Sequence, residues 1–135
     1  MINIDLPALV VSALEKIGCD RSLIGDLDAH SPIELSFKGT PNIYVEANTE
    51  SVWLVSYIGN FSEEEIRVRA EALTMPLIQG RSWVDGAFVA MGFQGGELII
   101  KGRVNEEALQ DAEPFAEAIS DFFGVVGEIA TVCAQ

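Results

Sequence analysis

The stretch from Ser62 to Gly80 most constrains how this chain can fold, because it carries a helix start signal, a helix stop signal and a wide apolar face. Ser62 and Glu65 have the spacing of a capping box, in which each side chain accepts a hydrogen bond from the other residue's backbone N–H. Gly80 is typical of a helix end. The pattern predicts one helix over this stretch, with Pro76 ending or kinking it near residues 73–75.

The apolar residues of this predicted helix form two neighbouring stripes. Residues three and four positions apart lie on the same side of a helix. By this spacing, one stripe consists of Ile66, Ala70, Leu73 and Leu77, and the second consists of Val68, Ala72 and Met75. Together the two stripes offer more apolar surface than a small domain needs for its own core.

Periodic patterns outside this helix predict a single α+β domain over residues 1–135. Alternating apolar residues indicate strands, and spacings of three and four indicate helices. The predicted elements are a helix over 5–17 capped by Asp5, strands at 33–37, 43–47 and 51–59, the helix described above, strands at 84–93 and 97–104 joined by Gly95 and Gly96, and a last helix from Pro114. This order of helix, three strands, helix, two-stranded hairpin and helix lacks βαβ alternation and favours an antiparallel sheet.

The last predicted helix carries a regular core stripe. Its members recur at spacings of four and three and are Phe115, Ile119, Phe122, Val126, Ile129 and Cys133. Gly124 and Gly127 interrupt this helix, and each costs about 1 kcal/mol relative to Ala. Two such glycines predict that a neighbouring element approaches closely.

Composition and charge argue against several classes of partner. The chain has 21 acidic and 8 basic residues and a formal net charge of −13, so no nucleic-acid partner is expected. After Arg103 there is no Lys or Arg, and the acidic face that results would repel an anionic membrane. No run approaches the roughly 18 apolar residues of a membrane span, and the N-terminus lacks a leader pattern. A cytosolic protein is therefore expected.

Motifs for catalysis or cofactor binding are missing from the sequence. Cys19 and Cys133 fit neither a disulfide framework nor a zinc spacing. There is no P-loop, dinucleotide fingerprint or nucleophile elbow, so neither an enzyme nor a cofactor is expected. One alternative stays open, a small metal-assisted enzyme that uses Asp26, Asp28 and His30 at alternate positions. The capping of turns before a strand explains the same three residues.

Surplus apolar surface points instead to a protein partner. Trp53 and Tyr57 lie on the outer side of the third predicted strand, and Phe88 lies opposite the core side of its own strand. Together with the two-striped helix, they exceed what one small core uses. Large exposed apolar patches usually mark interfaces. The sequence therefore predicts an interaction protein.

Residues 6–35 carry a resemblance to a known family and read LPALVVSALEKIGCDRSLIGDLDAHSPIEL. This run is similar to the opening of the type III secretion chaperones of the SpaK/InvB group, the class IB chaperones that serve several effectors. Further similar residues are Pro41 with Ile43, Val52 with Trp53, the hairpin at 95–98 and the region of Phe115. The resemblance covers nearly the whole chain and includes the same order of elements.

The resemblance implies a homodimeric chaperone in the cytoplasm of a Gram-negative bacterium. Such a protein binds the N-terminal chaperone-binding region of secreted effectors in extended form, prevents its aggregation and delivers it to the secretion apparatus. The secretion ATPase is a further partner that the resemblance suggests, and neither a cofactor nor turnover is implied. A general protein-binding adaptor of the same fold is a remaining alternative.

The resemblance also suggests which residues make contacts. In the family, the second helix and the strand after it form the two-fold interface, which corresponds here to Ile66, Ala70, Leu73, Leu77, Val84 and Phe88. Effectors lie over apolar positions of the first helix and the sheet. The candidates for effector binding are Leu6, Val10, Leu35, Phe37, Tyr44, Trp53, Val55 and Tyr57.

Overall fold

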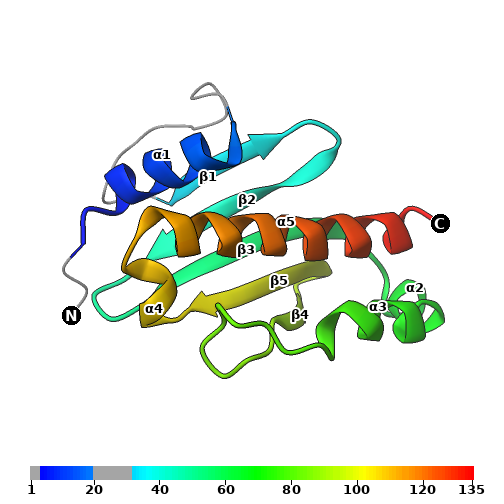
Figure 1. Ribbon diagram of the computed structural model, residues 1–135. Coiled ribbons are helices and arrows are strands. Elements are labelled where there is room, and N and C mark those ends of the chain that lie inside the picture. The colour runs from blue at the N-terminus through cyan, green and yellow to red at the C-terminus, as the bar shows by residue number, and fades with distance from the viewer. Residues whose placement is uncertain (1–3, 20–31) are drawn as a thin grey trace.

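The computed structural model describes residues 4–19 and 32–135, which form a five-stranded antiparallel sheet with helices packed on it (Figure 1). The strands are β1 (Ile33–Phe37), β2 (Thr40–Ala47), β3 (Val52–Asn60), β4 (Ala90–Gln94) and β5 (Glu97–Val104). Their order across the sheet is β1-β2-β3-β5-β4, and all neighbours are antiparallel. The predicted α+β class with an antiparallel sheet is confirmed.

Two helices, α1 (Leu6–Ile17) and α5 (Ala112–Cys133), lie across one face of the sheet (Figure 1). Helix α1 begins and ends as predicted, because the Asp5 side chain accepts a bond from the backbone N–H of Ala8 and Gly18 closes the helix with a φ of 86°. Helix α4 (Glu106–Leu109), capped by Asn105, leads into α5. None of the described helices is long and apolar enough to cross a membrane.

The core lies between α5 and the sheet. Five members of the predicted α5 stripe are buried, namely Phe115, Ile119, Phe122, Val126 and Ile129, and Cys133 is half-buried. They share one cluster with Ile43, Val45 and Leu54 of β2 and β3. The predicted close approach at Gly124 and Gly127 is wrong, since a Cβ at either position would meet nothing within 4 Å.

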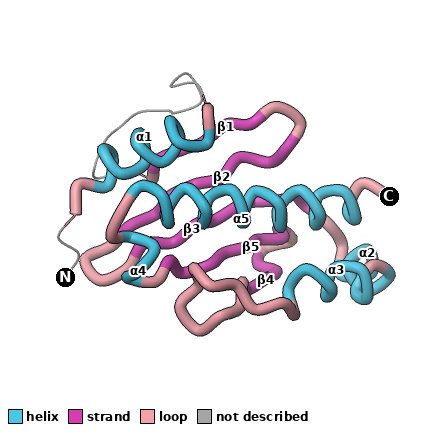
Figure 2. Tube along the Cα trace, in the orientation of Figure 1, coloured by secondary structure: helices cyan, strands magenta, loops and turns pink. Residues whose placement is uncertain are grey.

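The predicted single helix over 62–80 is two helices, α2 (Glu63–Val68) and α3 (Ala70–Leu77) (Figure 2). The capping box of Ser62 and Glu65 starts α2 as expected. The break lies at Arg69 and not at residues 73–75, because the Arg69 guanidinium turns to α5 and donates to the carbonyl oxygens of Val132 and Gln135. Pro76 stays in the last turn of α3, which ends before Gly80.

The predicted strand over 84–93 is also shorter than expected. Only Ala90–Gln94 form β4, and Val84 makes an isolated bridge to Val104. Between them, Gly86 and Ala87 have φ values of 86° and 78°, a left-handed turn that interrupts strand pairing. The β4–β5 hairpin itself is confirmed, with Gly95 and Gly96 at positive φ.

Candidate protein-binding surfaces

The first candidate surface is the sheet face opposite to α1 and α5. Residues that pair in register project to the same face of a sheet. Tyr44 pairs with Val55, Glu46 with Trp53, and Trp53 with Arg103. We call Tyr44, Trp53, Val55 and Tyr57, which gather along β3 and its neighbour β2, the outer strip.

Contacts within the outer strip hold its side chains in place. The rings of Tyr44 and Tyr57 meet edge to face with centroids 5.5 Å apart, and the Tyr57 hydroxyl donates to Glu46 at 3.1 Å. The Lys101 ammonium lies 5.0 Å from the centre of the Trp53 ring. Two effects raise the pKa of Tyr57 above its usual value. Partial burial is the larger, and the hydrogen bond to Glu46 is the next. The strip is therefore an ordered aromatic surface.

The second candidate surface lies on α2, α3 and the loop that follows them. Its large apolar side chains are strongly exposed: Val68 by 73%, Met75 by 54%, Ile78 by 56% and Phe88 by 56%. We call these four residues the α3 patch. A Cβ at Gly80 would lie 3.9 Å from the Phe88 ring, so the loop brings Phe88 back beside the end of α3. Exposed apolar groups of this size mark a surface suited to a partner.

One carboxylate fixes the loop that carries Phe88. Asp121 of α5 accepts a bond from the Arg81 guanidinium at 2.7 Å and another from the indole N–H of Trp83 at 2.7 Å. Arg81 also donates to the carbonyl oxygen of Pro76 at 3.0 Å. Trp83 is buried against Phe122, with ring centroids 5.8 Å apart. These contacts hold the loop that carries Phe88, and thus one side of the α3 patch, against the core.

The six residues predicted for a dimer interface divide into buried and exposed groups. Leu73 and Val84 lie in the core of the chain, and Ile66 and Leu77 are half-buried against that core. Ala70 and Phe88 are exposed. Apart from Ala70, the first predicted stripe therefore packs against the core, and the second stripe, with Val68 and Met75, faces outward. The sequence spacing indicates this second stripe, whereas the family resemblance assigns the interface to the first.

The eight residues predicted for effector binding do not form one surface. Tyr44, Trp53, Val55 and Tyr57 come together in the outer strip, and Val55 is buried there. Val10 and Leu35 are fully buried on the other side of the sheet, and Leu6 and Phe37 are half-buried against the core. The roles of all eight in binding remain predictions.

Sequence reasoning missed two cationic residues beside the outer strip. Lys101 pairs with Val55, and Arg103 pairs with Trp53, so β5 places both cations along one side of the strip. The alternation of Ile100 and Val104 with Lys101 and Arg103 was the available signal, because it sends the charged residues to the outer face.

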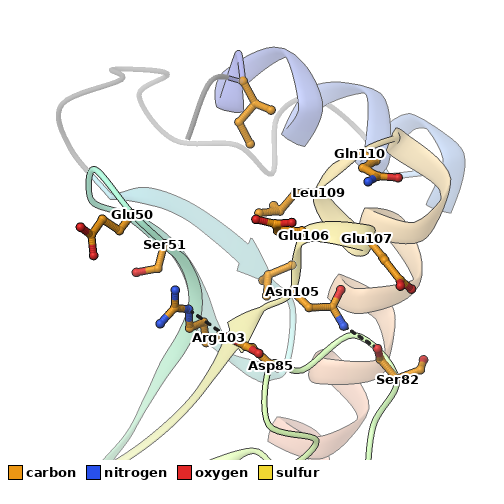
Figure 3. A pocket seen from close by; sticks show the side chains of 12 residues that line it. Glu50, Ser51, Ser82, Asp85, Arg103, Asn105, Glu106, Glu107, Leu109 and Gln110 are labelled. Carbon is orange, nitrogen blue, oxygen red and sulfur yellow. Dashed lines mark hydrogen bonds and ion pairs between the residues drawn. The ribbon is translucent and has the colours of Figure 1, made fainter. Parts of the chain in front are cut away.

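A polar cavity of about 900 Å³ opens where β5 meets α4 (Figure 3). Four carboxylates surround it, those of Glu50, Asp85, Glu106 and Glu107, and Arg103 lies 3.4 Å from Asp85 in an exposed ion pair. The arrangement offers no nucleophile paired with a base. It therefore supports no particular reaction.

The metal-site alternative cannot be placed on the structure. Asp26, Asp28 and His30 lie outside the described residues. Within residues 4–19 and 32–135, no group of three or more His, Cys, Asp or Glu side chains is arranged to hold a metal ion.

Comparisons with known proteins agree on one family. The family model of the Invasion protein B family matches residues 18–95. Two relatives, both named Surface presentation of antigens protein SpaK, come from Salmonella typhimurium strain LT2 and Salmonella typhi. Each is 36% identical over 123 residues, which cover 91% of this chain and 91% of the relative.

A solved structure has the same fold. It is a chain of the heterodimeric ExoU–SpcU complex from the type III secretion system of Pseudomonas aeruginosa, and it superposes with a TM-score of 0.57 at 13% identity. The match covers 96% of this chain and 97% of that chain. This match shows the fold, and the family match and the relatives lead to one conclusion. The chain belongs to the invasion protein B family, the SpaK/InvB group of type III secretion chaperones.

Proposed function

We propose that this protein is a cytosolic chaperone that binds the N-terminal chaperone-binding region of secreted effectors and keeps it extended, unaggregated and ready for the secretion apparatus. The outer strip is the single observation that best supports this role. It presents Trp53 and Tyr57 on an accessible sheet face, held by neighbouring side chains. Rigid aromatic side chains are typical of protein interfaces, because they bury large areas at low entropic cost.

Sheet edges offer a second mode of contact. Strands β1 and β4 lie at the two ends of the strand order. An extended segment can add a strand to such an edge, where backbone pairing supplies affinity with little demand on sequence. Delivery to the secretion ATPase is part of the proposal by family resemblance alone.

The working form in this proposal is a homodimer, joined through the α3 patch. Of the residues first expected at the interface, Ala70 and Phe88 are available on this surface, and Ile66 and Leu77 lie partly accessible beside it. Leu73 and Val84 then support the interface from within the core. A stable interface of standard size buries about 800 Å² per partner, and four large exposed apolar side chains provide a suitable centre for one.

Co-expression tests the proposal directly. The full chain is produced together with tagged N-terminal regions of proteins secreted by the same bacterium. The molar mass of each purified complex is measured by light scattering. We expect two copies of the chain per N-terminal region. The control is each secreted protein without that region, which should retain none of the chain. Retention by the folded remainder alone would indicate an adaptor, and no retention at all would contradict the proposed function.

A further inference from the structure

The outer strip separates side chains of opposite charge. One row across the sheet runs from Glu46 on β2 through Trp53 on β3 to Arg103 on β5. Since residues in register share a face, the row begins with a carboxylate, crosses an aromatic ring and ends with a guanidinium.

A second row repeats this arrangement. It runs from Glu34 on β1 through Tyr44 and Val55 to Lys101 on β5. Neighbouring strands lie about 4.8 Å apart, so the acidic and basic margins are separated by roughly 10 Å or more. Among the described residues, no ion pair joins the two margins, and the apolar strip lies between them.

The charged groups at these margins remain accessible to a partner. Glu34 accepts bonds from Asn42 and Ser36, both at the oxygen Oε1, and Glu46 accepts one from the Tyr57 hydroxyl. Lys101 is exposed and lies over the Trp53 ring. Arg103 meets Asp85 only in the exposed pair at 3.4 Å.

We infer that the outer strip binds an amphipathic segment whose own charges are divided in the complementary sense. Apolar side chains of the segment lie on Trp53 and Tyr57, the accessible members of the strip. Its acidic side chains lie toward Lys101 and Arg103, and its basic side chains lie toward Glu34 and Glu46. The inference rests on the proposed function and specifies the chemistry of the secreted segment that the chaperone accepts.

Complementary charge at the margins gives the surface a means of selection. Apolar contact alone accepts many sequences, whereas like charges placed against each other disfavour the wrong partner or the wrong orientation. The net charge of −13 by itself favours any basic segment. Beside β5, the site instead favours acidic residues of the segment. An experiment can therefore distinguish this local effect from the effect of the overall net charge.

The test uses the N-terminal region that co-purifies with the wild-type chain. Its affinity is measured by calorimetry for the wild type, Lys101→Glu and Lys101→Met, with Lys38→Glu as the matched control. Lys38 is exposed in the turn between β1 and β2 and pairs with no residue of the outer strip. We expect Lys101→Glu to weaken binding about three- to tenfold. Lys101→Met, which removes the charge and keeps the aliphatic stem, should have a smaller effect in the same direction, and Lys38→Glu should have none.

A reversal in the partner completes the test. The acidic residues of the bound segment are replaced by Lys one at a time. The replacement that faces residue 101 should restore affinity for Lys101→Glu and weaken binding to the wild type. Trp53→Ala should weaken binding of every segment about tenfold or more. Thermal unfolding of each variant reports whether its fold is retained.

The outcomes separate this inference from the proposed function. If the wild type retains N-terminal regions and both Lys101 variants bind as tightly as Lys38→Glu does, the charge-divided site is wrong and the chaperone role stands. If a fully basic segment binds Lys101→Glu no better than the wild type, and no partner reversal restores affinity, the site is likewise wrong. If the wild type retains no N-terminal region, the proposed function fails, and this site with it.

Discussion

Gly102 determines whether the loop after α3 can reach the core. A Cβ built at this position would lie 2.7 Å from Cη2 and 3.1 Å from Cζ3 of Trp83, so the indole packs directly on the backbone of β5. The ring has little freedom to withdraw, because its N–H is bonded to Asp121 and its edge meets Phe122. A single hydrogen atom at Gly102 is therefore what allows Trp83 to be buried.

We expect Gly102→Ala to lower the free energy of unfolding by about 1–3 kcal/mol, because overpacking forces Trp83 out of its site. Urea denaturation followed by tryptophan fluorescence measures the change. Gly92→Ala is the matched control, since Gly92 also lies in a paired strand and a Cβ there would meet nothing within 4 Å. Equal stability of the two variants would contradict this account of Trp83.

At the level of single elements, local patterns in the sequence predicted those whose determinants are local. The Asp5 cap, the Gly95–Gly96 hairpin and the α5 stripe all follow from spacings of a few residues. The order of helices and strands came from the same signals. These features could be predicted because neighbouring residues alone decide them.

The elements whose predicted boundaries were wrong depend on contacts between residues that are distant in the sequence. The α2–α3 break at Arg69 involves bonds to Val132 and Gln135, more than 60 positions away along the chain. The shortened β4 follows a left-handed turn at Gly86 and Ala87, and the residues just before that turn are held to α5 by the bond from Trp83 to Asp121. A periodic pattern cannot reveal such contacts, because it depends only on residues within one stretch of the sequence.

The candidate surfaces were predictable only in part for the same reason. Trp53 and Tyr57 could be assigned to an outer face by alternation along β3. Leu35 could have been assigned to the core, because it alternates with Glu34 and Ser36. Which stripe of the 62–80 stretch faces α5 depends on how helix and core dock, and the spacing alone leaves both orientations open.

Helix α2 should lose stability in acid through its capping box. The hydrogen bond from the backbone N–H of Ser62 to the Glu65 carboxylate is the main cause that lowers the pKa of Glu65, and the Ser62 side chain adds to the effect. A carboxyl whose folded pKa lies below its unfolded value of about 4.3 stabilises the fold above that value. The contribution is lost as the pH falls through the folded pKa.

Carboxyl carbon NMR should give a Glu65 pKa below that of an unstructured peptide. Glu65→Gln should remove this part of the acid dependence of unfolding, and Glu64→Gln, which leaves the capping box intact, should keep it. An ordinary Glu65 pKa in the folded protein would contradict the assigned role of the capping box.

At the scale of the whole molecule, the proposed dimer makes a prediction about assembly. Met75 is exposed in the single chain and would be buried in the interface, so Met75→Asp places an unpaired carboxylate in an apolar contact. We expect the dimer dissociation constant to rise about a hundredfold or more. Sedimentation over a range of concentrations should show a dimeric wild type and a largely monomeric variant with unchanged helical content.

Ile17→Asp is the control for this experiment, because Ile17 is also an exposed apolar residue of a helix but lies at the end of α1, outside the α3 patch. It should sediment like the wild type. A monomeric wild type, or a Met75→Asp variant that remains dimeric, would exclude the α3 patch as the interface.

The two tryptophans of the chain lie on opposite sides of the sheet. Trp53 stands half-exposed in the outer strip, and Trp83 is buried between β5 and α5 beside Phe122. The protein therefore contains two intrinsic fluorophores in different surroundings, one quenched readily by acrylamide and the other shielded from it. With either one replaced by Phe, the remaining emission reports partner docking at Trp53 or loosening of the core at Trp83, without any added label.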